Sequence, residues 1–361
     1  GGAGSTGSAG AGQTRWVASE ATPAAESVAS VTVDDAGNAW LAAAGGGELR
    51  LSKIDRGGTV VLERRFAYPR ELSTRAISPA PGGGVFLAVP GACFRGCVLP
   101  IPQLDLGGGP VGNDGAIVRF DAAGGWLSQF SIASADVPSI ASDGRGRVAV
   151  LQGAQAKTVV VYDAAGNPLF QAGPFAAPRS LPAFAPDGKL LAAFPDRNFR
   201  GGFAARTAAY DASGQERWTC TALSGQVPAV VLAVGNDAFA WLDGNELVLS
   251  AVPSCLERFR VDPGVPVTSL LPMRDGGVLA MGWLSTGACA TSRLRRFDPH
   301  GGLLWSRDLP PGGCPDVRVA DGAVAPDGDA LAAGIVAGSA DLGTGQRDAG
   351  SGDAFVVDVS P

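Results

Sequence analysis

The chain has little of what enzymes most often use. Histidine occurs once in 361 residues, as His300 in the expected hairpin turn 298–302, so the sequence shows no convincing His-based catalytic triad or histidine metal site. No apolar run reaches the roughly 20 residues of a membrane-spanning helix. Acidic residues outnumber basic ones by 34 to 28, which does not favour a nucleic-acid partner. We therefore predict a protein that is not an enzyme and needs no cofactor, and that meets a membrane only through a lipid anchor.

Glycine and proline are abundant instead, with 53 and 26 residues, as a chain with many tight turns requires. A short unit recurs, in which a turn of small residues lies between two short apolar strands. Seven copies run through residues 31–41, 77–87, 140–150, 184–191, 232–242, 271–279 and 324–331. Such a unit cannot bury its own apolar face, so its repetition predicts an array of β-sheet blades.

Each unit continues into a hairpin whose turn has the pattern Asp-x-x-Gly or close to it. Asp caps such a turn and Gly takes its positive φ angle. The pattern begins at Asp55, Asp121, Asp163, Asp211 and Asp298, whereas the fifth unit has Val252-Pro-Ser-Cys255 in its place.

The repeats predict an all-β fold, a seven-bladed β-propeller. The expected blades cover residues 28–67, 74–132, 137–173, 178–222, 228–261, 267–309 and 315 to the end. The last blade lacks a fourth strand, and residues 13–19 resemble the fourth strand of the sixth blade. We expect this N-terminal strand to close the ring, which removes an open sheet edge. Six or eight blades are the alternatives. Residues 13–361 then form one domain, preceded by a flexible Gly/Ser/Ala tether at 1–12.

Unusual sequence gathers in three insertions, at 91–114, 195–206 and 338–353, which the strand order puts on one face. Phe and Arg are enriched at binding hot spots, and such loops are common places for binding sites. The candidate binding residues are Phe94, Arg95, Arg197, Phe199 and Arg200.

Two of these insertions resemble a known family. Ala340-Asp-Leu-Gly-Thr-Gly345 followed by Gly352-Asp-Ala-Phe-Val-Val357 is similar to the repeat of bacterial β-propeller repeat (SBBP-type) proteins, and Leu104-Asp-Leu-Gly-Gly-Gly109 followed by Asp114 repeats it. The full motif covers about a quarter of the chain. The resemblance implies an exported propeller and implies no activity.

Oxygen-donor side chains in these Gly-rich loops form a weak calcium motif. The candidate ligands are Asp105, Asp114, Asp341 and Asp353. The twelve-residue spacing of an EF-hand is missing, and Asp in Gly-rich loops is ordinarily turn chemistry. Calcium is therefore possible rather than required.

Six cysteines suggest an oxidising compartment, in which they would form three disulfides. Cys93 and Cys97 would close a small loop. Cys289 and Cys314 are expected on the same face of neighbouring blades. Cys220 and Cys255 pair by elimination.

We predict a non-catalytic, exported propeller that binds or scaffolds another protein at the cell surface or in the periplasm. The chain begins with Gly1 rather than Met and continues as a Gly/Ser tether, as in exported lipoproteins. The expected location is therefore periplasmic, anchored to the outer membrane or extracellular. The alternative is a propeller that binds a polysaccharide or cleaves it with carboxylates alone.

Overall fold

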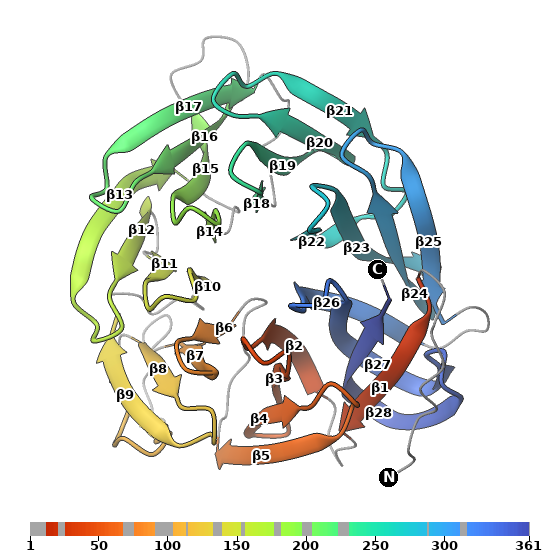
Figure 1. Ribbon diagram of the computed structural model, residues 1–361. Helices are drawn as coiled ribbons and strands as arrows, with labels where there is room; N and C mark the ends of the chain where they lie inside the picture. Colours follow the sequence, from red (N-terminus) through yellow and green to blue (C-terminus); the bar gives the residue numbers. More distant parts are fainter. Residues whose placement is uncertain are drawn as a thin grey trace.

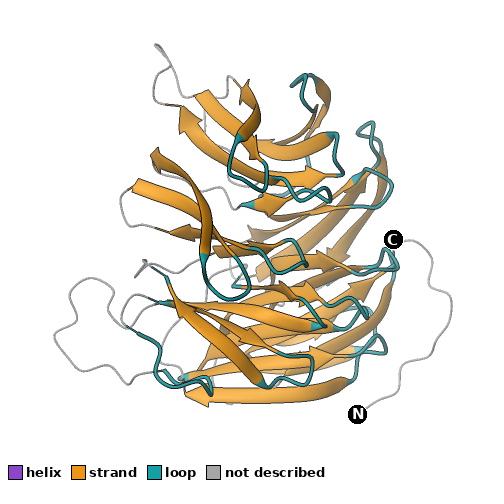
Figure 2. Ribbon diagram, turned by 60° about the vertical axis from the view of Figure 1, so that its left-hand side comes forward, coloured by secondary structure: helices purple, strands orange, loops and turns teal. Residues whose placement is uncertain are grey.

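The computed structural model describes residues 12–20, 26–67, 76–90, 104–112, 115–132, 139–152, 156–176, 182–196, 204–222, 231–286, 289–310 and 316–360. All regular structure in these residues is β-strand, so the described part of the chain contains no helix that could cross a membrane (Figure 2). The strands form small antiparallel sheets that stand side by side in a ring (Figure 1).

Five sheets have four strands each, in chain order, and are called units 1 to 5. Unit 1 has β2 (Glu26–Val33), β3 (Ala39–Gly45), β4 (Glu48–Ile54) and β5 (Val60–Ala67), and unit 2 has β6 (Ile77–Ala80), β7 (Gly84–Val89), β8 (Ala116–Phe120) and β9 (Trp126–Ser131). Unit 3 has β10 (Ser139–Ser142), β11 (Val148–Gln152), β12 (Ala156–Tyr162) and β13 (Pro168–Ala176), and unit 4 has β14 (Ala183–Phe184), β15 (Leu190–Asp196), β16 (Ala204–Tyr210) and β17 (Glu216–Ala222). Unit 5 has β18 (Val231–Val234), β19 (Ala238–Asp243), β20 (Glu246–Ala251) and β21 (Glu257–Val261).

The sixth sheet has eight strands and consists of two four-stranded halves. Unit 6 has β22 (Val267–Pro272), β23 (Val278–Thr286), β24 (Cys289–Phe297) and β25 (Leu303–Leu309). Unit 7 has β26 (Asp316–Val324), β27 (Ala330–Asp341), β28 (Gln346–Val359) and, from the other end of the chain, β1 (Thr14–Glu20). A single parallel bridge, Ala290 with Asp316, joins the halves. β1 pairs antiparallel with β28 from Thr14 opposite Val359 to Glu20 opposite Ala354.

The first strand of every unit lies toward the centre of the ring and the fourth toward its outside (Figure 1). The first strands contact one another in succession, from β2 through β6, β10, β14, β18 and β22 to β26, and β26 contacts β2. The succession of contacts therefore returns to its starting strand.

The hydrophobic core of the described residues is divided into seven clusters, and each lies between two consecutive units. Units 1 and 2, for example, bury Trp40 and Leu49 against Ile77 and Leu87. The cluster between units 7 and 1 buries Trp16 of β1 with Val31 and Val356. Apolar burial thus holds each unit to both neighbours, since a single sheet cannot bury its own apolar face.

A second contact recurs at the outer edge of these interfaces. A large side chain of the fourth strand lies against the turn glycine of the next unit, so closely that a Cβ on Gly58 would come within 2.9 Å of Trp16 Cβ. The other pairs are Leu62 with Gly124, Phe130 with Gly166, Phe170 with Gly214, Phe259 with Gly301 and Trp305 with Gly12. Between units 4 and 5 a disulfide takes this place. It joins Cys220 to Cys255, which has a φ of 60° where other units have glycine.

The two ends of the described chain together form the seventh outer turn. In unit 1, Gly58 N donates to Asp55 O over 3.0 Å and Asp55 N to Thr59 O over 2.9 Å. In unit 7, Gly12 N donates to Ser360 O over 3.1 Å and Ser360 N to Gln13 O over 3.0 Å. Gln13 N also donates to Ser360 Oγ, as Thr59 N donates to Asp55 Oδ1. Ser360 thus stands for the turn aspartate and Gly12 for the turn glycine.

The predicted loop at 338–353 is wrong in part. β27 and β28 extend through most of it as a long hairpin, with Gly338 opposite Ala349 and Asp341 opposite Gln346. The physical reason is the two-residue period of a strand, because Ala340 and Leu342 are buried while Ser339 and Asp341 are exposed. The strand ranges elsewhere agree with the predicted blades to within a few residues.

Candidate functional site: the β25 surface

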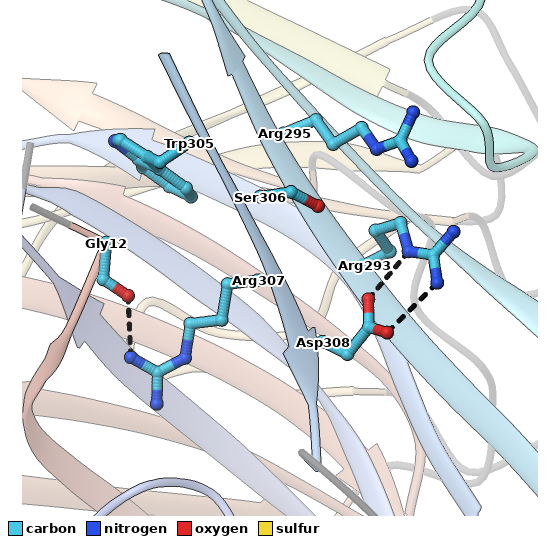
Figure 3. A pocket seen from close by; sticks show the side chains of 7 residues that line it. All are labelled: Gly12, Arg293, Arg295, Trp305, Ser306, Arg307 and Asp308. Atoms are coloured by element: carbon cyan, nitrogen blue, oxygen red, sulfur yellow. Dashed lines mark hydrogen bonds and ion pairs between the residues drawn. The ribbon is translucent and has the colours of Figure 1, made fainter. Parts of the chain in front are cut away.

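β25 is the outermost strand of unit 6 and pairs only with β24. From Trp305 to Leu309 the side chains of β25 alternate about the strand axis, whereas a register shift against β24 interrupts the alternation between Leu303 and Trp305. Trp305 and Arg307 lie on one side of β25, toward Gly12 (Figure 3). On the other side, Ser306 pairs with Arg295 of β24, and Asp308 pairs with Arg293. We call residues 303–308 with Arg293, Arg295 and Gly12 the β25 surface.

Arg293 and Asp308 form a two-point ion pair. Nε donates to Oδ1 over 2.6 Å and Nη2 donates to Oδ2 over 2.9 Å (Figure 3). This parallel geometry is the strongest form of an arginine–carboxylate contact. The hydrogen bonds lower the pKa of Asp308 and raise that of Arg293. Each charge is therefore compensated by the other.

Arg307 has carbonyl oxygens as partners instead. Nη1 donates to Gly12 O over 2.7 Å and Nη2 donates to Leu342 O over 3.4 Å. Burial lowers the pKa of Arg307, and the negative charge of Asp341 acts in the opposite direction. Within the described residues no carboxylate comes within ion-pair distance of this guanidinium group.

Arg295 is the least satisfied of the three arginines. Its Nε is buried and has no hydrogen-bond acceptor among the described residues. Its guanidinium lies beside Gly264, where an added Cβ would come within 2.5 Å of Nη1. It has no ion pair with any carboxylate in the described ranges, although its charge helps to lower the pKa of Asp308.

A pocket of about 510 Å³ lies on this surface. It is lined by Gly12, Arg293, Arg295, Trp305, Ser306, Arg307 and Asp308. Three guanidinium groups and one carboxylate give the lining a net positive charge, although the chain as a whole carries −6. Leu303 and Leu304 directly precede it on β25 and are 51% and 52% exposed. The arrangement can bind an anionic group next to an apolar one.

A second group of charges lies where β1 meets units 7 and 1. Arg15 of β1 donates to Asp329, and Asp358 lies opposite Trp16 in the sheet. Asp329 and Asp358 are 3% and 5% exposed, and Asp358 Oδ1 has no hydrogen-bond partner. Burial, together with the charge of Asp329, raises the pKa of Asp358 to about 7. Burial and the charge of Asp327 raise the pKa of Asp329.

Two of the calcium candidates, Asp105 and Asp341, lie in different units, and the carboxylate of each accepts hydrogen bonds from its own turn. Asp105 Oδ1 accepts hydrogen bonds from Gly107 N at 2.8 Å and Gly109 N at 3.1 Å. Asp341 Oδ1 accepts from Gly343 N at 2.7 Å and Gly345 N at 3.0 Å. The leucine that follows each Asp is buried, so the family-like motif caps a turn and anchors it to the core.

Asp353, the third candidate, is buried within β28 rather than placed in a loop, and Asp114 lies outside the described residues. No group of three or more possible metal-ligating side chains occurs in the part of the chain that the structure describes.

The predicted hot-spot residues also lie outside the described ranges, so they stay predictions; these are Phe94, Arg95, Arg197, Phe199 and Arg200. The disulfide between Cys220 and Cys255 is present, with a Cα–Cα distance of 5.4 Å. Cys289 is disulfide-bonded too. Cys93, Cys97 and Cys314 lie outside the described residues, so the other two pairings stay predictions.

The sequence does contain a signal for the β25 surface that was not used. Arg293 and Arg295 are two residues apart in a strand, and so are Ser306 and Asp308, which puts each pair on one side. The more obvious signal of the β25 sequence is its likeness to residues 14–19. Its two exposed leucines and its contact with Gly12 depend on the way the units meet, which a strand pattern does not contain.

No family model and no curated protein matches the sequence. Solved structures do match. A chain in the crystal structure of the Mitotic Checkpoint Complex is 13% identical with a TM-score of 0.58, over 99% of this chain and 95% of that one. The C-terminal WD40 domain of Sif2 is 12% identical with a TM-score of 0.51, over 94% of this chain and 98% of that domain. At these identities the likeness shows the fold alone, and the fold is a β-propeller.

Proposed function

We propose that the chain is a seven-bladed β-propeller, closed by β1, that works as a non-catalytic scaffold and binds another protein. Support for the blade number comes from the seven core clusters and from the succession of first strands that returns to β2. Support for closure comes from the pairing of β1 with β28 and from the turn that Gly12 and Ser360 form together.

The observation that carries protein binding is the β25 surface. Two adjacent leucines, each about half exposed, stand beside a pocket with a net positive charge on an unpaired strand edge. Exposed apolar side chains next to Trp and Arg are typical of binding hot spots. The structure named for the Mitotic Checkpoint Complex is itself an assembly, so this fold serves protein binding in at least that case.

An exported location belongs to the same proposal. The Cys220–Cys255 disulfide links two consecutive units and is typical of oxidising compartments. The family-like turn motif at Asp105 and Asp341 agrees with an SBBP-type propeller of the periplasm or cell surface.

The test is a photocrosslinking amino acid placed at Leu304 in the exported full-length protein. We expect a discrete crosslinked partner. Leu169, in the fourth strand of unit 3, is the matched control because it is 45% exposed and its neighbours along the strand, Pro168 and Phe170, carry no charge. Leu303→Ser should abolish the crosslink at 304. Equal crosslinking from 304 and 169, or none from 304, would contradict the proposal.

A further inference from the structure

The β25 surface has an excess of positive charge in a particular place. Asp308 is fully used by Arg293, through two hydrogen bonds in parallel. Arg295 has no carboxylate partner and Arg307 has only carbonyl partners among the described residues. Two of the three guanidinium groups that line the pocket therefore form no ion pair with a carboxylate in the described ranges.

Of these two, Arg295 is the one with donors to spare. Arg307 is already held by Gly12 O and Leu342 O, whereas no nitrogen of Arg295 has a hydrogen-bond acceptor among the described residues. A partly buried cation without an anion has lost hydration that nothing replaces, so an entering oxyanion gains more there than at an exposed arginine. The planar guanidinium matches a carboxylate through two parallel hydrogen bonds.

The groups beside Arg295 restrict the chemistry of the ligand further. Ser306 lies opposite Arg295 in the sheet and is exposed, so its hydroxyl can donate to the same anion. Leu304 precedes Ser306 by two residues on β25, at the register shift against β24, and is 52% exposed. A ligand that contacts both the Arg295–Ser306 pair and Leu304 therefore carries a carboxylate close to an apolar side chain.

We infer that the β25 surface receives an acidic segment of the partner protein, with a Glu or Asp carboxylate bound by Arg295 and Ser306 and an apolar side chain on Leu304. The inference rests on the proposed function and assigns the chemistry of the partner. Arg307 contributes charge from the other side of the strand. The net charge of −6 repels acidic segments at long range, so the attraction is local to this pocket.

The probe is a labelled peptide of alternating Leu and Glu, compared by fluorescence anisotropy with the same peptide in which Gln replaces Glu. We expect the Glu peptide to bind the full chain at least about tenfold more tightly. Arg295→Gln should abolish that difference, whereas Arg217→Gln, which changes an exposed arginine of β17, should leave it unchanged. Equal binding of the two peptides by the unmodified protein would overturn the inference.

Ser306→Glu gives a second variant on an exposed position, where misfolding is not expected. The new carboxylate would pair with Arg295 and compete with the ligand. It should weaken binding of the Glu peptide at least about tenfold, and Ser306→Gln serves as control. Inorganic phosphate that competed better than acetate would overturn the carboxylate assignment. A crosslink at 304 that persisted in both Arg295→Gln and Ser306→Glu would support the proposed partner binding. The same result would contradict the inference that the partner binds through a carboxylate.

Discussion

Units 1 and 7 place opposite charges at the same position of the third strand. Lys53 precedes Ile54, the last residue of β4, and Asp358 precedes Val359, the last residue of β28. In unit 1, Lys53 Nζ lies 2.9 Å from Asp34 and 3.1 Å from Ala122 O, and 5.0 Å from the ring of Trp40. In unit 7, the cation is Arg15, which comes from β1 and contacts Asp329.

The pKa values follow from this difference. Burial alone would raise the pKa of Asp34, but hydrogen bonds from Asn38 and Lys53 outweigh it and the pKa is lowered. For Asp358, burial and the negative charge of Asp329 outweigh the positive charge of Arg15, and the pKa is raised to about 7. Unit 1 therefore stabilises its buried charge within a continuous stretch of chain, whereas unit 7 depends on a strand from the opposite terminus.

Deleting β1 should have the largest effect. Removal of residues 1–20 exposes the edge of β28, leaves Asp329 without Arg15 and opens the cluster around Val31 and Val356. We expect the melting temperature to fall by more than about 5 °C, since 1 kcal/mol corresponds to roughly 1–2 °C in a domain larger than 250 residues. Removal of residues 1–11 should leave the melting temperature unchanged. Equal melting temperatures for the two truncations would show that β1 does not close the ring.

Lys53→Met should be the most costly single substitution in unit 1. It leaves the Asp34 carboxylate buried without a cation, which costs about 3–5 kcal/mol in comparable buried pairs. The free energy of unfolding from urea titration measures this loss. Lys189→Met is the control, because Lys189 and Asp187 form a more exposed pair, expected to contribute below about 1 kcal/mol. Similar losses for the two would contradict the role given to burial.

Asp358 should make stability depend on pH in the opposite direction from Asp34. The folded state holds the Asp358 proton up to about pH 7, whereas the unfolded chain releases it near 3.8. Stability therefore falls as the pH rises between these values and then levels off. Asp34 has a lowered pKa, so its contribution is present above 3.8 and is lost as the pH falls.

Asp358→Asn should remove the fall in stability that the Asp358 carboxyl group causes as the pH rises. At pH 8 its free energy of unfolding should be about 2–4 kcal/mol higher than that of the unsubstituted chain. Urea titrations at a series of pH values measure it, and Asp163→Asn, at an exposed turn, serves as control. An unchanged slope in Asp358→Asn would mean that this carboxyl group does not titrate as described.

The smallest effect concerns the two turns. Gly12 and Gly58 have φ angles of 74° and 81°, and each lies against a tryptophan. Alanine at either position is strained and should cost about 1–2 kcal/mol. We expect equal losses for Gly12→Ala and Gly58→Ala in urea titration. A loss for Gly58→Ala alone would show that the split turn is not equivalent to the continuous one.

Strand ranges could be predicted from the sequence because turn chemistry is local. Asp55 and Gly58 fix their hairpin through bonds within five residues, and the same pattern marks four other units. The Arg15–Asp329 contact spans 314 positions, and charge alone does not tell which carboxylate an arginine meets. The sequence predicts a loop at 338–353 because several glycines interrupt the pattern in which Ala340 and Leu342 are the buried positions.

Recognition of the candidate site depends even more on how the units pack against one another. Cys220 and Cys255 could be paired only by elimination, and their proximity follows from the contact between units 4 and 5. Arg295 becomes a binding candidate only because Asp308 is used by Arg293 and no other carboxylate reaches it within the described residues. Which carboxylates reach an arginine depends on its neighbours in three dimensions, so it cannot be predicted from a single sequence.

The turn made by Gly12 and Ser360 brings together two strands that are far apart in the order of synthesis. β1 is translated before every other strand of the array, whereas β28, its pairing partner, is translated after them. A chain that stops before residue 354 has no strand to receive β1 and leaves a sheet edge unpaired at each end of the array. Synthesis through β28 is thereby converted into a structural difference that a protease or chaperone can recognise.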